Sequence, residues 1–307
     1  MKELFRWRPG SWVVFAWGVA CWLGLAQTAR AGGGAAWTEI PMSPRIASLG
    51  RIVTVGARPW EAPLVNVAAI AGGRGDALAV SRVAWIQGVR AQQAVFVHSG
   101  GRLSLALWAG LLEVPGIERR TARDELIGEF TAHHVRAGAG MARSLGRGVE
   151  VGLAVEWLFQ KIDVYEAGAI SVDLGLRKDD LPAGLAAALA VRGLPLTESL
   201  GQGGLSPTTG ISAGLAWWFA VGERADAFRL EVDALYAEGG SFRAAGGLEV
   251  RPVRALELRL GYLSGLDLQG FSFGLGLRMA RFCIDYGYLP FRQGFGNVHS
   301  FGVALRL

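Results

Sequence analysis

Apolar and polar residues alternate along the last third of the chain. In the segment 256–262, the even-numbered positions are apolar and the odd-numbered positions are charged or glycine. The segments 271–278 and 282–288 repeat this alternation. A period of two predicts β-strands, because successive side chains leave opposite faces of a strand. One face carries Leu, Phe, Ile and Tyr while the other mixes charges with glycine, as in a membrane-spanning β-barrel.

Strands of this kind can be placed from Gln93 to the end of the chain. An even strand number is expected of a bacterial barrel, and a short strand at 52–55 or 77–84 completes such a set. We therefore predict an all-β fold, a transmembrane antiparallel barrel of about fourteen strands. The predicted strands cover 93–99, 102–110, 129–144, 148–160, 167–177, 183–192, 208–220, 226–237, 241–251, 254–264, 270–279, 281–289 and 298–307.

The polar faces of these strands carry charges that we expect to point into the lumen. An arginine on the lipid-facing side costs about 2–4 kcal/mol at mid-membrane, whereas water or an opposite charge satisfies it in the lumen. Seven acids and five bases favour pairing across the lumen over a selective pathway of one sign, which is the alternative. The predicted lumenal charges are Glu150, Glu156, Asp173, Arg177, Arg229, Glu231, Asp233, Glu257, Arg259, Arg278, Asp285 and Arg306.

The first 31 residues have the pattern of a cleavable signal peptide. A basic start is followed by the apolar stretch 11–26, and Ala29-Arg30-Ala31 has the form that signal peptidase cleaves. We predict cleavage after Ala31. Two alternatives are a lipoprotein, with Cys21 at the end of a lipobox-like sequence, and an uncleaved inner-membrane anchor.

Removal of this segment changes the charge and the cysteine content. It holds four bases and one acid, so it accounts for three of the five net positive charges. The remaining charge is small, and the sequence gives no reason to expect a nucleic-acid partner. Cleavage also leaves Cys283 as the single cysteine, which excludes an internal disulfide. Cys283 itself is interpreted as a small lumenal residue.

The mature chain divides into two parts. Residues 32–92 are predicted to form an N-terminal segment with a short helix and a first strand, and residues 93–307 to form the barrel. The charged segment 111–128 and the segment 193–207 are predicted extracellular loops. Although the chain is 51% hydrophobic, the mature part contains no apolar run of the roughly 18 residues that a transmembrane helix needs.

The C-terminal residues resemble the signal that the barrel-insertion machinery recognises. Ser300, Gly302, Leu305 and Leu307 occupy its polar, glycine and apolar positions, with Leu307 where Phe or Trp is usual. The expected partners are therefore the insertion machinery and the lipid of the outer membrane.

Several segments resemble the PorV/PorQ-type family of outer-membrane proteins. Gly246–Gly265 is similar to its "GxEY…LALRAGY.SG" segment, and Phe271–Arg278 to the strand that follows. Asp285–Pro290 resembles "DYAYVP", Gly296–Phe301 resembles "GNTHRFSL", and Val151–Gly175 shares the spacing of an upstream motif. The resemblance implies a fourteen-stranded barrel like the fatty-acid transporter FadL, in the bacterial outer membrane, with an N-terminal segment in or near the lumen. It also implies, for some members, a role in type IX secretion.

No enzyme, cofactor or metal motif is recognisable. His133 and His134 are adjacent, so on a strand they face opposite ways and cannot hold one metal ion together. Gly72-Gly73-Arg74-Gly75 lacks the Lys-Ser/Thr of a phosphate-binding loop and is interpreted as a turn. We predict a protein that is not an enzyme and has no catalytic, cofactor or metal site.

Two functions remain open. The first is a PorV/PorQ-type barrel that acts in transport or as the membrane partner of a type IX-like secretion system. The alternative is a FadL-like passive transporter of small hydrophobic molecules, which predicts an apolar lumenal pocket, a gap in the wall and an N-terminal segment that plugs the pore. A general porin would instead have an open lumen.

Overall fold

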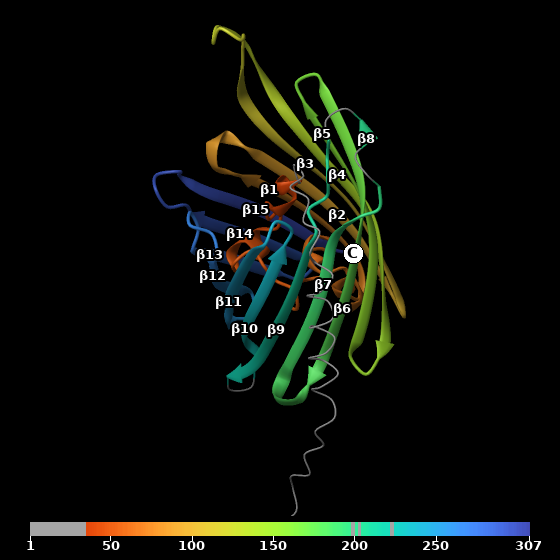
Figure 1. The fold of residues 1–307 in the computed structure, drawn as a ribbon. Coiled ribbons are helices and arrows are strands. Elements are labelled where there is room, and N and C mark those ends of the chain that lie inside the picture. The colour runs from red at the N-terminus through yellow and green to blue at the C-terminus, as the bar shows by residue number, and fades with distance from the viewer. Residues whose placement is uncertain (1–34, 198–199, 202–203, 222–223) are drawn as a thin grey trace, which may run out of the picture. The chain divides into compact units, whose positions relative to one another are not determined.

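A closed antiparallel β-barrel makes up the described part of the chain (Figure 1). The structure is a computed structural model that describes residues 35–197, 200–201, 204–221 and 224–307. The signal-peptide prediction, with Ala29 and Ala31, falls outside these residues. Within them, no helix has the length and apolar character needed to cross a membrane.

Fourteen long strands form the wall, as the alternation predicts. Each strand pairs with its neighbours in sequence, except that β7 pairs with β9, and β1 pairs with β15 from Ala77↔Arg306 to Ala84↔His299 to close the barrel. A two-residue strand, β8, adds to β6 beyond the end of β7. The strands are β1 Gly75–Ala84, β2 Arg90–Gly100, β3 Leu103–Arg120, β4 Leu126–Gly146, β5 Val149–Ile162, β6 Tyr165–Leu181, β7 Leu185–Pro195, β8 Leu200–Gly201, β9 Gly210–Val221, β10 Arg224–Ala237, β11 Ser241–Val253, β12 Leu256–Ser264, β13 Phe271–Met279, β14 Phe282–Pro290 and β15 Asn297–Arg306.

On strands β12 to β14, the outer face of the wall is apolar and the inner face is mostly polar or glycine. On β12, Leu258 and Leu260 are 42% and 41% exposed, whereas Glu257 and Arg259 between them are 0% and 4% exposed. The same alternation runs through β13 and β14. β2 also alternates in burial, but its inner face is largely apolar, with Ala91, Val95 and Val97 in the core. This confirms the predicted fold class, because only a barrel that presents its apolar face to lipid leaves so many large hydrophobic side chains uncovered.

One local expectation was wrong, and one left open is decided. The segment 111–128 is mostly strand, since β3 continues to Arg120, β4 begins at Leu126, and only a short turn remains between them. The pairing of β3 with β4 is irregular between Val114 and Ile117, where Pro115 has no N–H group to donate. On its other side, β3 pairs with β2 only as far as Glu113, which lies opposite Arg90 at the start of β2. The segment 52–55 is not a strand, and the strand left open at 77–84 is β1, inside the N-terminal segment.

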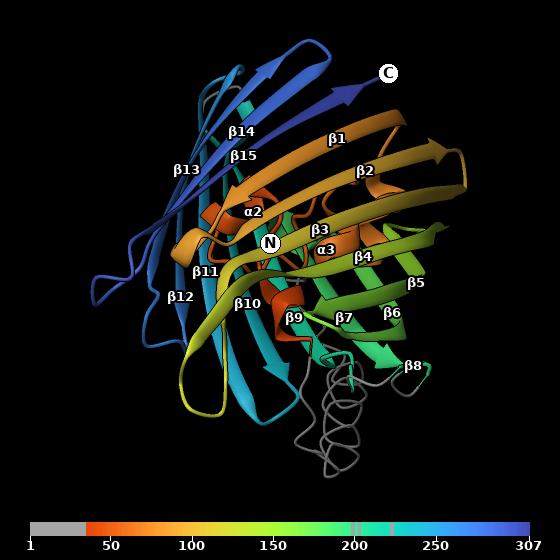
Figure 2. The ribbon, with the colours of Figure 1, turned by 90° about the horizontal axis from the view of Figure 1, so that it is seen from above.

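Residues 35–74 fold inside the barrel, and we call them the plug (Figure 2). The plug contains the short helices α2 (Pro44–Ser48) and α3 (Ala62–Val65) and the 3₁₀ turns Ala36–Glu39 and Val67–Gly72. Ser43 caps α2, because its Oγ accepts a hydrogen bond from the backbone N–H of Ile46. Nearly all residues of 41–70 are buried, so the plug forms the core of the barrel.

Glycines on the inner face allow the plug backbone to touch the wall. A Cβ atom added at Gly152 would lie 2.6 Å from the Ala68 nitrogen, and one added at Gly261 would lie 2.2 Å from the Gly50 nitrogen. Such contacts require the absence of a side chain. The glycine-rich inner face that the sequence shows is therefore the surface against which the plug packs.

This contact can be tested with one methyl group. Gly152→Ala should lower the free energy of unfolding by about 1–3 kcal/mol, because the added carbon overpacks the contact with the plug. Denaturant unfolding of the purified protein in detergent measures the change. Gly246→Ala is the matched control, since a Cβ there meets nothing within 4 Å. Equal stability of the two variants would contradict the close contact.

Candidate functional site in the plugged lumen

The twelve predicted lumenal charges occupy three kinds of position. Arg177 and Arg278 are partly buried, and Arg306 is exposed at the end of β15, where it donates to the Ala280 carbonyl. The others are buried, namely Glu150, Glu156, Asp173, Arg229, Glu231, Asp233, Glu257, Arg259 and Asp285. The structure brings four of the twelve together in one cluster and spreads the others around the wall.

This wall cluster consists of Glu249, Glu257, Asp285, Arg251, Arg259 and Arg278 on strands β11 to β14. Glu257 is its centre and contacts Arg278 at 2.6 Å, Arg251 at 3.0 Å, and Arg259. Arg259 also reaches Glu249 at 3.0 Å and Asp285 at 2.7 Å. The strand period explains the arrangement, because every second residue of adjacent strands faces the same side.

Two arginines of the plug complete the cluster. Arg45 lies 2.7 Å from Glu249 and 2.8 Å from Glu61, while Arg58 lies 2.5 Å from Glu257 and 2.8 Å from Asp285. All six side chains are buried. The lumenal charges therefore pair not only within the wall but also with the plug.

Sequence reasoning missed Arg45, Arg58, Glu61 and Glu249. One signal for the plug residues was available, since the predicted lumenal set has more acids than bases and therefore needs cations from elsewhere. The N-terminal segment supplies them, with Arg45, Arg51 and Arg58 in a short stretch.

Strand β10 holds the plug backbone through its side chains. Glu231 accepts hydrogen bonds from the backbone N–H groups of Val55 at 2.9 Å and Gly56 at 3.0 Å, and Asp233 accepts one from Thr54 at 2.9 Å. Arg229 donates to the Gly56 carbonyl at 2.7 Å. The polar groups of this extended plug segment are thereby satisfied without a neighbouring strand.

The remaining predicted charges form contacts on strands β3 to β7, away from the wall cluster. Arg136 forms an ion pair with Glu156 at 2.6 Å, and Trp108 donates to the same carboxylate at 2.7 Å. Arg177 lies 3.6 Å from Glu150. Asp173 accepts from the backbone N–H of Gly193 at 2.7 Å, where β7 approaches its end.

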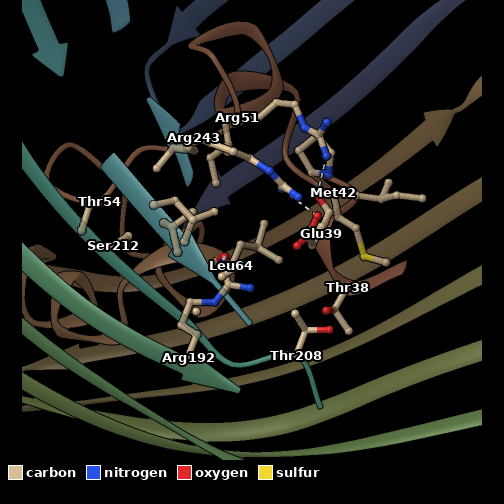
Figure 3. Close-up of a pocket in the computed structure, with 18 of the residues that line it drawn as sticks. Thr38, Glu39, Met42, Arg51, Thr54, Leu64, Arg192, Thr208, Ser212 and Arg243 are labelled. Atoms are coloured by element: carbon tan, nitrogen blue, oxygen red, sulfur yellow. Dashed lines mark hydrogen bonds and ion pairs between the residues drawn. The ribbon is translucent and has the colours of Figure 1, made fainter. Parts of the chain in front are cut away.

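A cavity of about 90 Å³ remains between the plug and the wall (Figure 3). It lies where β7, β10 and β12 end and β9 and β11 begin, opposite the end of the barrel that carries Leu307. Its apolar lining includes Ile52, Leu64 and Leu235. Its polar lining combines four arginines with one carboxylate, namely Arg51, Arg136, Arg192, Arg243 and Glu39.

Arg51 belongs to the plug and lies in an unusual setting for an arginine. Burial lowers the pKa of Arg51 to about 10. The nearby Glu39 raises this pKa, and the nearby Arg243 lowers it further. The Arg51 guanidinium donates to the Glu39 carbonyl at 2.8 Å and to Gln269, and stacks 5.3 Å from the centre of the Trp85 ring. Trp85 belongs to the short connection between β1 and β2.

Other residues singled out in the sequence have no site around them. His134 is buried against Trp37, whereas His133 is partly exposed, and the described residues contain no group of side chains that could hold a metal ion. Cys283 is buried. Of the predicted insertion signal, Ser300 and Gly302 face inward, Leu305 is partly buried, and Leu307 is exposed.

A closed fourteen-stranded barrel plugged by its own N-terminal segment is the architecture of FadL-type outer-membrane barrels. Solved structures of that kind are similar in fold. The Ralstonia pickettii toluene transporter TbuX matches with a TM-score of 0.65 and 13% identity, over 88% of this chain and 100% of that one. The Pseudomonas putida toluene transporter TodX gives 0.61 and 11%, over 84% and 95%.

A Pseudomonas aeruginosa FadL homologue gives a TM-score of 0.52 and 11% identity, over 92% of this chain and 97% of that one. No family profile matches the sequence, and no curated protein matches it. At these identities the likeness concerns the fold, and it supports the FadL-like part of the sequence-based resemblance. The specific PorV/PorQ resemblance stays a prediction.

Proposed function

We propose that this protein is a passive outer-membrane transporter of small hydrophobic molecules. The observation that carries the proposal is the cavity between plug and wall, whose lining includes the apolar side chains of Ile52, Leu64 and Leu235. Two solved barrels of similar fold are toluene transporters. A plugged lumen with a small partly apolar cavity suits one small molecule at a time, whereas a general porin needs an open, water-filled lumen.

The wall itself offers no gap within the described residues. Each long strand pairs with a neighbour on both sides, and β1 closes onto β15. Passage therefore requires the plug to move or the cavity to open. No described feature favours the secretion-partner role over transport, so transport is the single function proposed.

The proposal predicts that filling the cavity slows uptake. Cells that produce the protein should accumulate radiolabelled toluene several-fold faster than cells without it, and Leu235→Trp should remove most of this gain because the indole occupies the cavity. Leu230→Trp on the outer face of the same strand is the matched control, since Leu230 is 41% exposed. The proposal fails if uptake is no faster with the protein than without it. It also fails if Leu235→Trp transports as well as the control.

A further inference from the structure

We propose that the cavity binds the carboxylate of a small organic acid and that its apolar wall holds the rest of that molecule. This inference rests on the proposed transport function and narrows its substrate class. It starts from the charges around the cavity, which do not balance.

Within the described residues, two of the four cavity arginines form salt bridges and two do not. Arg136 pairs with Glu156 at 2.6 Å, and Arg243 pairs with Glu39 at 2.7 Å. In the described part of the chain, neither Arg51 nor Arg192 forms a salt bridge. Arg51 is held by the Glu39 carbonyl and Gln269, and Arg192 donates to the Leu64 carbonyl. Within the described residues, two positive charges therefore line a partly buried space without a carboxylate in salt-bridge contact, and Asp173 and Glu39 act on Arg192 and Arg51 only at longer range.

Hydrogen-bond donors around the cavity are also unused. The Nε atoms of Arg192 and Arg243 and the hydroxyl of Thr208 are buried and have no hydrogen-bond partner within the described chain. All three residues line the cavity. Buried polar groups in native proteins are almost always paired, so these donors indicate that an acceptor group belongs in the cavity.

A carboxylate fits this combination of donors and charge. Guanidinium groups bind carboxylates through charge-assisted hydrogen bonds that are roughly twice as strong as neutral ones. A neutral hydrocarbon of the same size would leave the donors of Arg192 and Thr208 unpaired, which costs free energy. Binding an anion is therefore favoured over binding its neutral isostere.

The size and lining of the cavity limit the rest of the ligand. At about 90 Å³ the cavity holds a short aliphatic chain or most of a single ring. The side chains of Ile52, Leu64 and Leu235 supply an apolar wall for such a body. Benzoate combines both features, and toluene has the same ring without the charge.

Calorimetric titration of the full-length protein in detergent tests the inference, with benzoate, toluene and acetate as probes. Benzoate should bind at least tenfold more tightly than toluene or acetate. Arg192→Gln and Arg51→Gln should each weaken benzoate binding roughly tenfold or more, because each removes a charged donor. Arg192→Lys keeps the charge, so it should lose less benzoate affinity than Arg192→Gln. Arg147→Gln, an identical change in an exposed turn, should have no effect.

Each remaining outcome decides the question. Absence of benzoate binding, or benzoate affinity that is unchanged in both glutamine variants, overturns the inference and leaves the cavity as a water-filled space. Inorganic phosphate that competes as well as benzoate would overturn the need for an apolar body. Heat-dependent gel mobility checks that each variant is a folded barrel, and Arg51→Gln in the plug serves if Arg192→Gln fails to fold. Toluene uptake without benzoate binding refutes this inference alone, whereas loss of toluene uptake refutes the proposed function.

Discussion

Planar bilayers that contain the full-length barrel should stay electrically silent, whereas a variant without residues 36–71 should give stable conductance steps. A fourteen-stranded barrel is much wider than the eight-stranded kind whose lumen side chains alone can fill. In this protein the plug fills that space, and its helices α2 and α3 lie within the ring of strands (Figure 2). Deletion leaves a lumen lined by charges and glycine, which water and ions can enter.

A milder variant separates the plug's bulk from its attachment. Arg45→Gln combined with Arg58→Gln keeps the plug but removes three of its salt bridges to the wall, at Glu249, Glu257 and Asp285, together with the Arg45–Glu61 pair inside the plug. We expect brief, irregular openings from this variant, between silence and the steady current of the deletion. Arg147→Gln should stay silent like the wild type. A silent deletion variant that still forms a folded barrel would show that the plug does not close the lumen.

Glu257→Gln should lower the free energy of unfolding by about 3–5 kcal/mol, because it leaves buried arginines without their shared counter-charge. Glu257 is 0% exposed and contacts Arg58, Arg251, Arg259 and Arg278. The amide keeps the shape of the side chain, so the loss isolates the charge. Unfolding in urea, followed by tryptophan fluorescence, measures the change.

Glu129→Gln provides the control for this measurement, since Glu129 is an exposed strand residue. A further test joins Glu257→Gln with Arg58→Gln. If the two residues stabilise the same contact, the free energy of unfolding should fall less in the double variant than the sum of the decreases in the two single variants. Wild-type stability in Glu257→Gln would contradict the central role of this carboxylate.

The wall was predictable from the sequence because its physical signal is local. Alternation along β12, β13 and β14 requires only neighbouring residues, and a lipid-facing surface makes it strong. The plug was much less predictable. Arg58 meets Glu257 and Asp285 across about two-thirds of the chain, and no periodicity marks such a contact. The surplus of wall acids pointed toward it, and the family resemblance implied an N-terminal segment in or near the lumen.

The misjudged segment 111–128 has a similar explanation. Its charges and Pro115-Gly116 are typical of a loop, yet β3 and β4 continue as a paired hairpin up to Arg120 and Leu126. Side chains on this part of the hairpin are largely exposed, so neither face needs to be apolar. Hydrogen bonds between the two strands hold it, and these bonds leave no mark on the residue pattern.

The pairing of β1 with β15 sets the order in which this barrel can form. The plug immediately precedes β1, and β1 is also the strand that closes the ring against the last strand of the chain. The backbone of the plug rests on wall glycines such as Gly152 and Gly261. A folded plug of this size could hardly pass through a finished wall. Closure of the β1–β15 seam should therefore be the final step of assembly, with the open sheet first wrapping around the plug.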